Sequence, residues 1–169
     1  MKKIIILNGY PESGKDLFAL YLSDILYSKH DISVDVVSSV EKVKQAATLL
    51  GWDGIKTKLN RNALSALKDL SSKFWDGPFK FMSAHIKNMK RDSCLVFMVR
   101  EPEEIQRMVN EFPQIITVFM KRNSSARADN HADQNVQNYN YDYYINNNGT
   151  KDELYSLTKT FVECKLIDE

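Results

Sequence analysis

The chain has 169 residues, of which 43% are apolar and 27% are charged, and this composition is typical of a single globular domain over residues 1–169 rather than of a disordered or disulfide-bonded chain. Its formal net charge of +1 excludes a strong electrostatic attraction to nucleic acid or to an anionic membrane surface, so we expect neither as a partner. The two distant cysteines, Cys94 and Cys164, and the lack of a long apolar run predict a cytoplasmic protein whose thiols are reduced and buried.

Short β-branched runs alternate with longer stretches of helical period, which is the pattern of an α/β fold with a parallel sheet covered by helices. Most of these runs are continuously apolar, as expected of strands that are buried on both faces. The first expected helix carries the stripe Phe18, Leu22 and Leu26, and the last begins at a capping box of Thr150 and Glu153. The five expected strands are Lys3–Asn8, Val34–Ser38, Cys94–Val99, Ile115–Met120 and Tyr143–Asn146.

Two segments interrupt this alternation. Residues 39–92 contain three helical patterns and no strand signal, which is more than a simple crossover requires, so we expect a helical insertion that can cover a substrate. Residues 121–140 are rich in Asn, Asp and Arg and poor in large apolar side chains, so we expect a mobile lid there. Within the insertion, a helix that packs against the sheet is predicted by the apolar spacing of Leu59, Ala63, Leu67 and Leu70.

The most informative segment follows the first expected strand and precedes the first expected helix. A loop of this length can turn its backbone N–H groups around a β-phosphate, and the following helix adds the positive end of its dipole. The lysine of the loop then reaches the β- and γ-phosphates, so the segment predicts an ATP site. It has the G-x4-G-K spacing of a P-loop and consists of Gly9, Tyr10, Pro11, Glu12, Ser13, Gly14, Lys15 and Asp16.

An aspartate, Asp16, occupies the position at which P-loops usually carry a Ser or Thr that binds Mg²⁺. A carboxylate beside a triphosphate is repelled unless a cation lies between them, so we predict that Asp16 contacts Mg²⁺ directly or through a water. The alternative is an acidic residue that only favours the helix dipole. Glu101, just after the third expected strand, is a second candidate for organising the metal, and the sequence does not decide between the two.

At this loop the chain resembles the nucleoside monophosphate kinase family, and most closely its deoxynucleoside monophosphate kinases, whose loop also reads G-K-D. Residues 38–44 resemble the stretch that opens the acceptor domain of these kinases, and residues 51–54 are similar to their acceptor region. Residues 141–150 are similar to the strand and turn that border the adenine pocket. The resemblance implies a P-loop NTPase fold and ATP- and Mg²⁺-dependent phosphorylation of a nucleoside or deoxynucleoside monophosphate. The acceptor-binding residues that it implies within or beside the insertion are Ser38, Lys44, Asp53 and Arg61.

Phosphoryl transfer between two anions requires cations around both phosphates, and arginine is the side chain best suited to grip them. Arg100 lies just beyond an expected strand, at the edge where open α/β sheets bind ligands, so we predict a phosphate clamp that is both catalytic and substrate-binding. The alternative for Arg100 is an ion pair with Glu101 or Glu103. Arg122 and Arg127 flank the expected lid, and the resemblance implies that they close over the migrating phosphoryl group. With Lys15 and Asp16, these three arginines form the predicted catalytic set.

Other side chains have weaker functional interpretations. Four aromatic residues can stack an acceptor base, although aromatic residues at helical spacing more often belong to the core: Trp52, Phe74, Trp75 and Phe79. Arg107, four residues after Glu103 on an expected helix, is expected to form a surface ion pair.

Two alternatives to a nucleotide kinase remain open. A nucleotide-binding regulator or weak NTPase can retain the fold without the acceptor chemistry, and a kinase for another small metabolite shares the fold as well. The sequence leaves the acceptor base and the choice of ribose or deoxyribose undecided. It is compatible with a homodimer but does not fix the oligomeric state.

Overall fold

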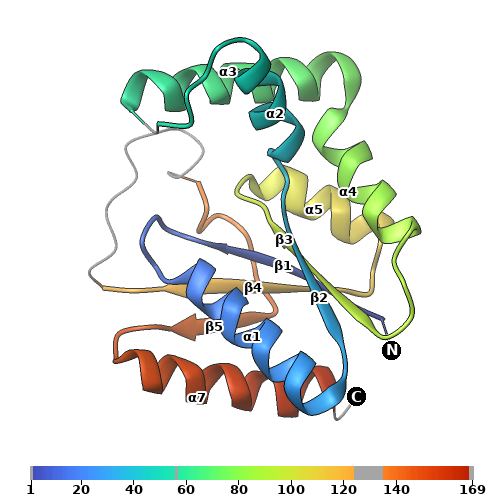
Figure 1. Cartoon of the computed structure of the whole chain (residues 1–169), viewed down its shortest axis with the longest axis vertical. Helices are drawn as coiled ribbons and strands as arrows, with labels where there is room; N and C mark the ends of the chain where they lie inside the picture. The colour runs from blue at the N-terminus through green and yellow to red at the C-terminus, as the bar shows by residue number, and fades with distance from the viewer. Residues whose placement is uncertain (1, 56, 124–134, 168–169) are drawn as a thin grey trace.

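The computed structural model describes residues 2–55, 57–123 and 135–167. A five-stranded, all-parallel sheet runs through the molecule in the order β2-β3-β1-β4-β5 (Figure 1). Helices cover both faces of the sheet, and this arrangement confirms the expected α/β class. The strands are β1 Lys2–Gly9, β2 Ser33–Ser38, β3 Ser93–Met98, β4 Ile115–Lys121 and β5 Tyr143–Asn146.

All five predicted strands are present, and each of their ends lies within one residue of its prediction. The central strand, β1, pairs with β3 on one side and β4 on the other, so its apolar run is buried on both faces. The edge strand β2 is different, because Val36 in its middle is 47% exposed. The interpretation of a strand buried on both faces therefore holds for β1 but not for β2.

The helices fall into three groups. α1 and α7 lie side by side on one face of the sheet, and α5 lies on the other (Figure 1). α2, α3 and α4 form the insertion between β2 and β3. No helix in the described ranges is both long and apolar enough to cross a lipid bilayer. The bounds are α1 Lys15–His30, α2 Glu41–Leu49, α3 Lys58–Trp75, α4 Gly77–Lys87, α5 Pro102–Glu111 and α7 Lys151–Phe161, followed by a π-helical turn at Val162–Ile167.

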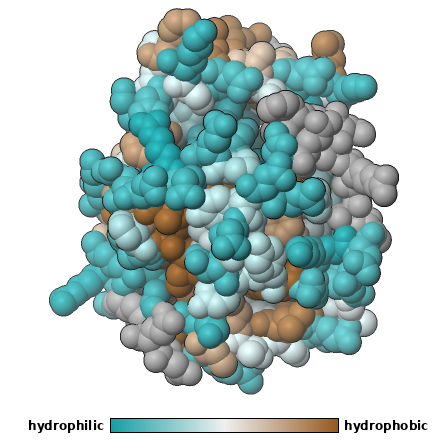
Figure 2. Space-filling model, turned by 180° about the vertical axis from the view of Figure 1, so that it is seen from behind, coloured by the Kyte–Doolittle hydropathy of each residue, from teal (hydrophilic) through white to brown (hydrophobic). Residues whose placement is uncertain are grey.

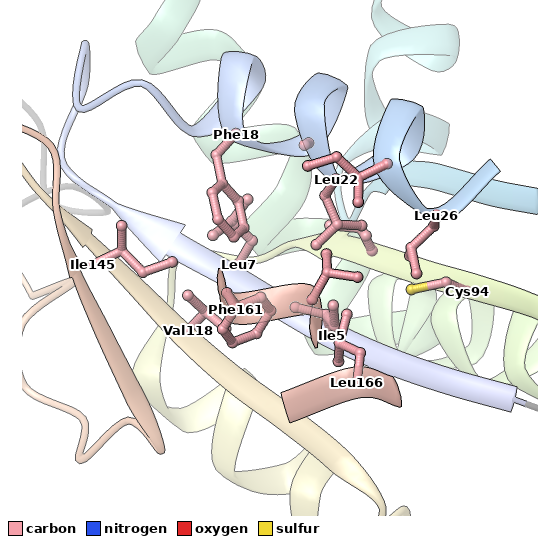
Figure 3. Packing of buried hydrophobic residues seen from close by; sticks show 14 of the residues in the cluster. Ile5, Leu7, Phe18, Leu22, Leu26, Cys94, Val118, Ile145, Phe161 and Leu166 are labelled. Carbon is pink, nitrogen blue, oxygen red and sulfur yellow. The ribbon is translucent and has the colours of Figure 1, made fainter. Parts of the chain in front are cut away.

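Successive residues of β1 belong to two different core clusters, as the two-residue period of a strand requires. Ile5 and Leu7 pack with side chains of α1 and α7, including the fully buried Phe18 (Figure 3). Ile4 and Ile6 pack on the opposite face with side chains of α4 and α5. The predicted capping box at the start of α7 is confirmed, because Thr150 and Glu153 bond to each other's backbone N–H groups. The sheet is thus a rigid platform for the loops at its carboxyl ends.

The predicted packing of α3 against the sheet is wrong. Leu59 is 77% exposed and Leu70 is 45% exposed, and the main neighbours of the helix are α2 and α4. Figure 2, which shows the molecule from behind, has apolar surface at the top, the end at which α3 lies in Figure 1. The spacing located the helix but could not show which face would be covered, because nothing in a helical period specifies the partner.

The two thiols lie in opposite environments. Cys94 is buried in β3, and desolvation raises the pKa of its thiol to about 12. Cys164 lies in the π-helical turn and is exposed, so the prediction of two buried cysteines is wrong for this residue. The turn follows α7 along the outside of the molecule, which leaves one of its sides in contact with solvent.

Candidate active site

The phosphate loop joins β1 to α1 in a backbone conformation that requires both motif glycines. Gly9 has φ +148° and Gly14 has φ +92°. A Cβ atom at Gly9 would lie 2.5 Å from the carbonyl oxygen of Met120, and one at Gly14 would overlap the side chain of Asn147. Glu12 also has a positive φ, of 62°, which is strained for a residue with a Cβ. The G-x4-G-K segment therefore forms a tight turn that packs against β4 and against the residue that follows β5.

Lys15 is the first residue of α1, and its side chain folds back into the loop. The Nζ atom donates to the carbonyl oxygens of Gly9 and Tyr10 at 2.7 and 2.6 Å, and it lies 3.4 Å from Oγ of Ser13. The positive charge is thus held inside the turn of the loop, at the N-terminal end of a sixteen-residue helix. This is the arrangement that attracts a phosphate group.

Asn8 joins three segments at the base of the loop. Its Oδ1 accepts the backbone N–H of Gly9 at 2.8 Å, and its Nδ2 donates to the carbonyl oxygen of Arg100 at 3.0 Å and to the hydroxyl of Tyr141 at 2.7 Å. The Tyr141 hydroxyl in turn donates to the carbonyl oxygen of Val136. Burial raises the pKa of this phenol, and the hydrogen bond from Asn8 opposes the increase.

A second buried asparagine holds the other side of the loop. Asn147, directly after β5, donates from Nδ2 to the carbonyl oxygen of Ser13 at 2.9 Å. Its backbone N–H donates to the carbonyl oxygen of Lys121 at 2.7 Å. The adjacent Asn148 accepts the backbone N–H of Asn123 through Oδ1. The loop is therefore connected to the end of β4, where the expected lid begins.

Neither Asn8 nor Asn147 was among the predicted site residues. The signal that points to them is their position, since each is a polar residue at the end of an expected strand. In a parallel sheet such residues share the edge at which ligands bind. Their burial, at 0% and 4% exposure, became evident only in the fold.

Those predicted catalytic arginines that the structure describes lie at the same edge of the sheet. Arg100 follows β3 and Arg122 follows β4, and both side chains are exposed. Since β3 and β4 are the two neighbours of β1, these residues flank the phosphate loop on both sides. Arg127 lies outside the described residues.

The predicted acceptor residues are spread along the insertion and the strand that precedes it. Ser38 ends β2 and is half-buried, Lys44 is half-buried in α2, and Arg61 is exposed on α3. Asp53 is exposed in the segment before α3, where its Oδ1 accepts the backbone N–H of Ile55 at 2.9 Å. This last bond is a local turn contact. Ser38 is the one of the four that lies at the sheet edge itself.

The two acidic candidates for the metal have different surroundings. Asp16 is exposed in the first turn of α1, next to Lys15, so its carboxylate can supply an oxygen ligand beside a bound polyphosphate. Glu101 instead lies with its Oε1 3.0 Å from Nζ of Lys68. The ranges that the structure describes contain no cluster of three or more His, Cys, Asp or Glu residues with the geometry to hold a metal ion. Asp16 as a magnesium ligand stays a prediction.

Arg107 forms an ion pair, but not with Glu103. Its guanidinium donates to both carboxylate oxygens of Asp76, at 2.5 and 2.7 Å, and stacks over the ring of Phe79 at 3.8 Å. These hydrogen bonds lower the pKa of Asp76 and raise that of Arg107. The predicted local pair is replaced by a contact between α5 and the junction of α3 and α4, because the fork geometry favours a bidentate partner.

Two aromatic residues at the end of α3 are not in the core, whereas Phe79 of α4 is half-buried and packs against it. Phe74 is 66% exposed and Trp75 is 61% exposed, whereas Trp52 is half-buried and donates from Nε1 to the carbonyl oxygen of Ile55. The core interpretation is therefore wrong for Phe74 and Trp75. Aromatic side chains instead gather beside the phosphate loop, where Tyr10 packs edge-on against Phe119.

Sequence comparisons do not assign the chain to a family. Protein-family models give no match, and a search of curated proteins gives no match either. The relationships that can be detected are therefore structural.

Solved structures of several kinases have a similar fold over nearly the whole chain. Shikimate kinase from Aquifex aeolicus has a TM-score of 0.52 at 13% identity, with 95% of this chain and 96% of that chain covered. APS kinase from Mycobacterium tuberculosis has a TM-score of 0.53 at 13% identity, with coverages of 96% and 99%. A sugar kinase from Janibacter has a TM-score of 0.50 at 13% identity, with coverages of 98% and 96%. The chain thus has the P-loop NTPase fold, in the form that these small-molecule kinases share.

Proposed function

We propose that the protein transfers a phosphoryl group from ATP to a small acceptor, and that this acceptor is a nucleoside or deoxynucleoside monophosphate. The observation that carries the proposal is the phosphate loop with the Lys15 ammonium held between its carbonyl groups, at the N-terminal end of α1. A bound polyphosphate offers that ammonium charged oxygens, which are stronger acceptors than carbonyls. The structural similarity to kinases supports phosphoryl transfer as the reaction.

The proposed roles follow from charge. Lys15 neutralises the β- and γ-phosphates, and Arg100 and Arg122 approach the migrating group from the two neighbouring strand ends. Arg127, with Arg122, acts from the lid over residues 121–140. Asp16 helps to hold Mg²⁺, which supplies further neutralisation of the phosphate oxygens when it is bound.

The acceptor is the finer part of the proposal. The resemblance of residues 38–44 and 51–54 to nucleotide kinases favours a nucleoside monophosphate, bound through Ser38, Lys44, Arg61 and Asp53. Kinases with the same fold are named for shikimate, for APS and for sugars, and these names favour a second candidate, the kinase of another small metabolite.

One experiment tests reaction and acceptor together. The protein is incubated with MgATP and a panel of nucleoside and deoxynucleoside monophosphates, with shikimate and simple sugars as further acceptors, and ADP formation is measured with and without each. We expect ADP formation that depends on one class of nucleotide acceptor. Dependence on a non-nucleotide acceptor would replace the acceptor assignment, whereas ATP binding without any acceptor effect would favour a nucleotide-binding regulator. The Lys15→Ala variant should lose both binding and turnover.

A further inference from the structure

The long helix of the insertion, α3, has an unusual anchor. Of its eighteen residues, all of which the structure describes, Lys68 alone is buried. Its main neighbours α2 and α4 belong to the same insertion, and none of the apolar side chains of α3 is buried. The buried lysine contacts the start of α5, at the carboxyl edge of the sheet, through ion pairs.

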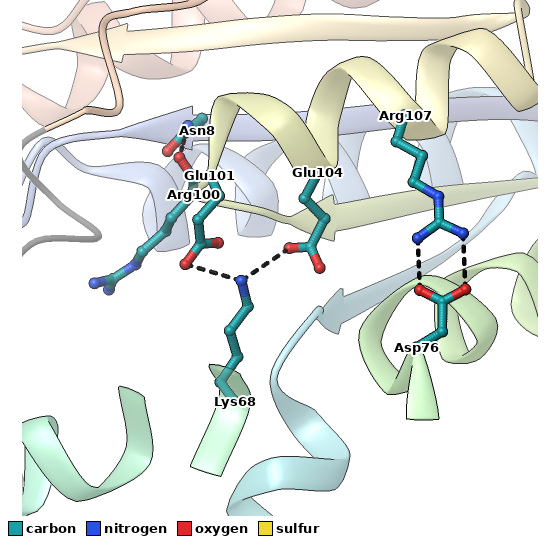
Figure 4. A network of polar contacts seen from close by, with 7 residues as sticks. All are labelled: Asn8, Lys68, Asp76, Arg100, Glu101, Glu104 and Arg107. Atoms are coloured by element: carbon teal, nitrogen blue, oxygen red, sulfur yellow. Dashed lines mark hydrogen bonds and ion pairs between the residues drawn. The ribbon is translucent and has the colours of Figure 1, made fainter. Parts of the chain in front are cut away.

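Lys68 lies between two carboxylates at the start of α5 (Figure 4). Its Nζ is 3.0 Å from Oε1 of Glu101 and 3.8 Å from Oε2 of Glu104. The side chains of Lys68 and Glu104 are only 10% and 11% exposed. Removal of the lysine leaves two neighbouring carboxylates without their shared counter-charge, so both depend on Lys68.

Glu101 connects this cluster to the proposed phosphate clamp. It directly follows Arg100 and is the N-cap residue that precedes α5. The carbonyl oxygen of Arg100 is held by Asn8, which also binds the first peptide of the phosphate loop (Figure 4). Lys68 thus contacts the residue next to Arg100, and the backbone of Arg100 is bonded to the residue that holds the start of the loop.

Glu104 makes the contact sensitive to pH. The charged groups that face it are Lys68 from α3, Glu101 and Arg107 from α5, and Asp76 from the junction of α3 and α4. Its Oε2 is buried and has no hydrogen-bond partner within the described part of the chain. Burial raises the pKa of this carboxyl to about 7, and Lys68 opposes the increase.

We infer that Lys68 is a positioning residue, whose contacts with Glu101 and Glu104 set the place of α3 relative to Arg100 and thereby the affinity for the acceptor. This inference rests on the proposed function. Arg107 and Asp76 tie the end of α3 to the same face of α5, so the lysine governs the central part of the helix and not its whole attachment. Among the residues that the structure describes, Lys68 has no contact with the phosphate loop or α1, where ATP is proposed to bind, whereas the proposed acceptor residue Arg61 lies on α3 itself. The effect therefore falls on the acceptor and not on ATP.

The test compares Lys68→Met with Lys73→Met in the full-length protein. Methionine keeps much of the lysine volume without its charge, and Lys73 is an exposed lysine of the same helix, so the second variant is a matched control for net charge. With MgATP and the best nucleotide acceptor, we expect Lys68→Met to raise the acceptor KM about tenfold or more while the ATP KM stays within about twofold. Lys73→Met should change neither value. Lys68→Arg should recover most of the acceptor affinity, because it restores the positive charge.

The pH dependence of the acceptor KM is a second measurement, which a merely structural role of these residues would leave unchanged. Because the acceptor phosphate also titrates near pH 6, the quantity measured is the ratio of the acceptor KM of Glu104→Gln to that of the wild type. We expect a ratio near one at pH 6, where Glu104 is largely protonated, and a change of about threefold at pH 8. Thermal melting of every variant checks that it is folded.

The outcomes separate this inference from the proposed function. Active wild type with an acceptor KM unchanged in folded Lys68→Met, or with equal changes in the acceptor and ATP KM values, overturns the role of Lys68 and leaves the kinase reaction intact. A wild type that forms no acceptor-dependent ADP overturns the proposed function and this inference with it.

Discussion

The helix that follows the phosphate loop and the long helix of the insertion are held in opposite ways. α1 buries five apolar side chains against the sheet, whereas α3 buries one lysine. The dispersion and hydrophobic contacts of α1 act over its whole length and are not subject to ionic screening, whereas the charges around Lys68 can be screened or titrated. The fold thus fixes the loop proposed to bind ATP firmly and holds α3 by contacts that are easier to rearrange.

The largest expected difference concerns two phenylalanines, one from each region. Phe18→Ala removes a fully buried side chain of α1, and we expect a loss of about 3–5 kcal/mol in the free energy of unfolding. Phe74→Ala removes an exposed side chain of α3, and a change within about 0.5 kcal/mol is expected. Urea denaturation of both variants measures the contrast. Similar losses in the two variants would show that α3 is covered by a partner in solution, and the contrast between α1 and α3 would be wrong.

The next effect concerns function. Lys15→Ala removes the cation from the phosphate loop, and we expect turnover to fall about 100-fold or more, because the charge on the migrating group loses its fixed counterion. Lys29→Ala, at the exposed end of the same helix, is the matched control and should retain turnover. Steady-state ADP formation measures both. A Lys15→Ala variant with full activity would remove the loop from the mechanism.

The insertion should respond to pH in a way that the loop region does not. The pKa of Glu104 is about 7 in the fold against 4.5 for a glutamate in the unfolded chain, so the folded state binds a proton that the unfolded state releases between these values. Its contribution to stability is present below about pH 4.5 and is lost as the pH rises through 7. Glu104→Gln should therefore be more stable than the wild type at pH 8, by about 1–3 kcal/mol, and nearly equal to it at pH 4. Denaturant titrations across this range measure the difference, and parallel pH profiles would contradict it.

The smallest effect concerns strain in the phosphate loop. Glu12 has a positive φ, so Glu12→Gly removes an unfavourable contact of its Cβ. Glycine also makes the unfolded chain more flexible, and once this entropic cost is subtracted we expect the free energy of unfolding to rise by about 0.5 kcal/mol. Glu41→Gly, in the first turn of α2, has no such strain to relieve and should lower it by a similar amount. Opposite signs in the two denaturation curves support the loop geometry, and a loss of stability in both would contradict it.

Much of the α1 region could be predicted from the sequence, and much of the α3 region could not. The stripe of Phe18, Leu22 and Leu26 identified a buried face because the strand that it covers lies next to it in the chain. The stripe that contains Leu59 and Leu70 identified a helix equally well, but this helix packs on other helices of the insertion and not on a strand, and both leucines are exposed. Periodicity reports that a face is apolar, and only packing decides whether it is covered.

The candidate site shows the same division. Gly9, Gly14 and Lys15 could be recognised because strand, loop and helix are consecutive, and their spacing alone fixes the turn. Asn8 and Asn147 could not, because their partners lie up to 134 residues away and an asparagine in sequence resembles an ordinary turn residue.

The sequence by itself determined the class of fold, the five strands and the phosphate loop, because each depends on residues that are close together along the chain. Only the tertiary structure decided the strand order, the neighbours of Asn8 and the pairing of Lys68 with Glu101 and Glu104. These contacts join distant segments, and many alternative partners have the same chemistry. The choice among them is made when the sheet assembles and brings particular strand ends to one edge.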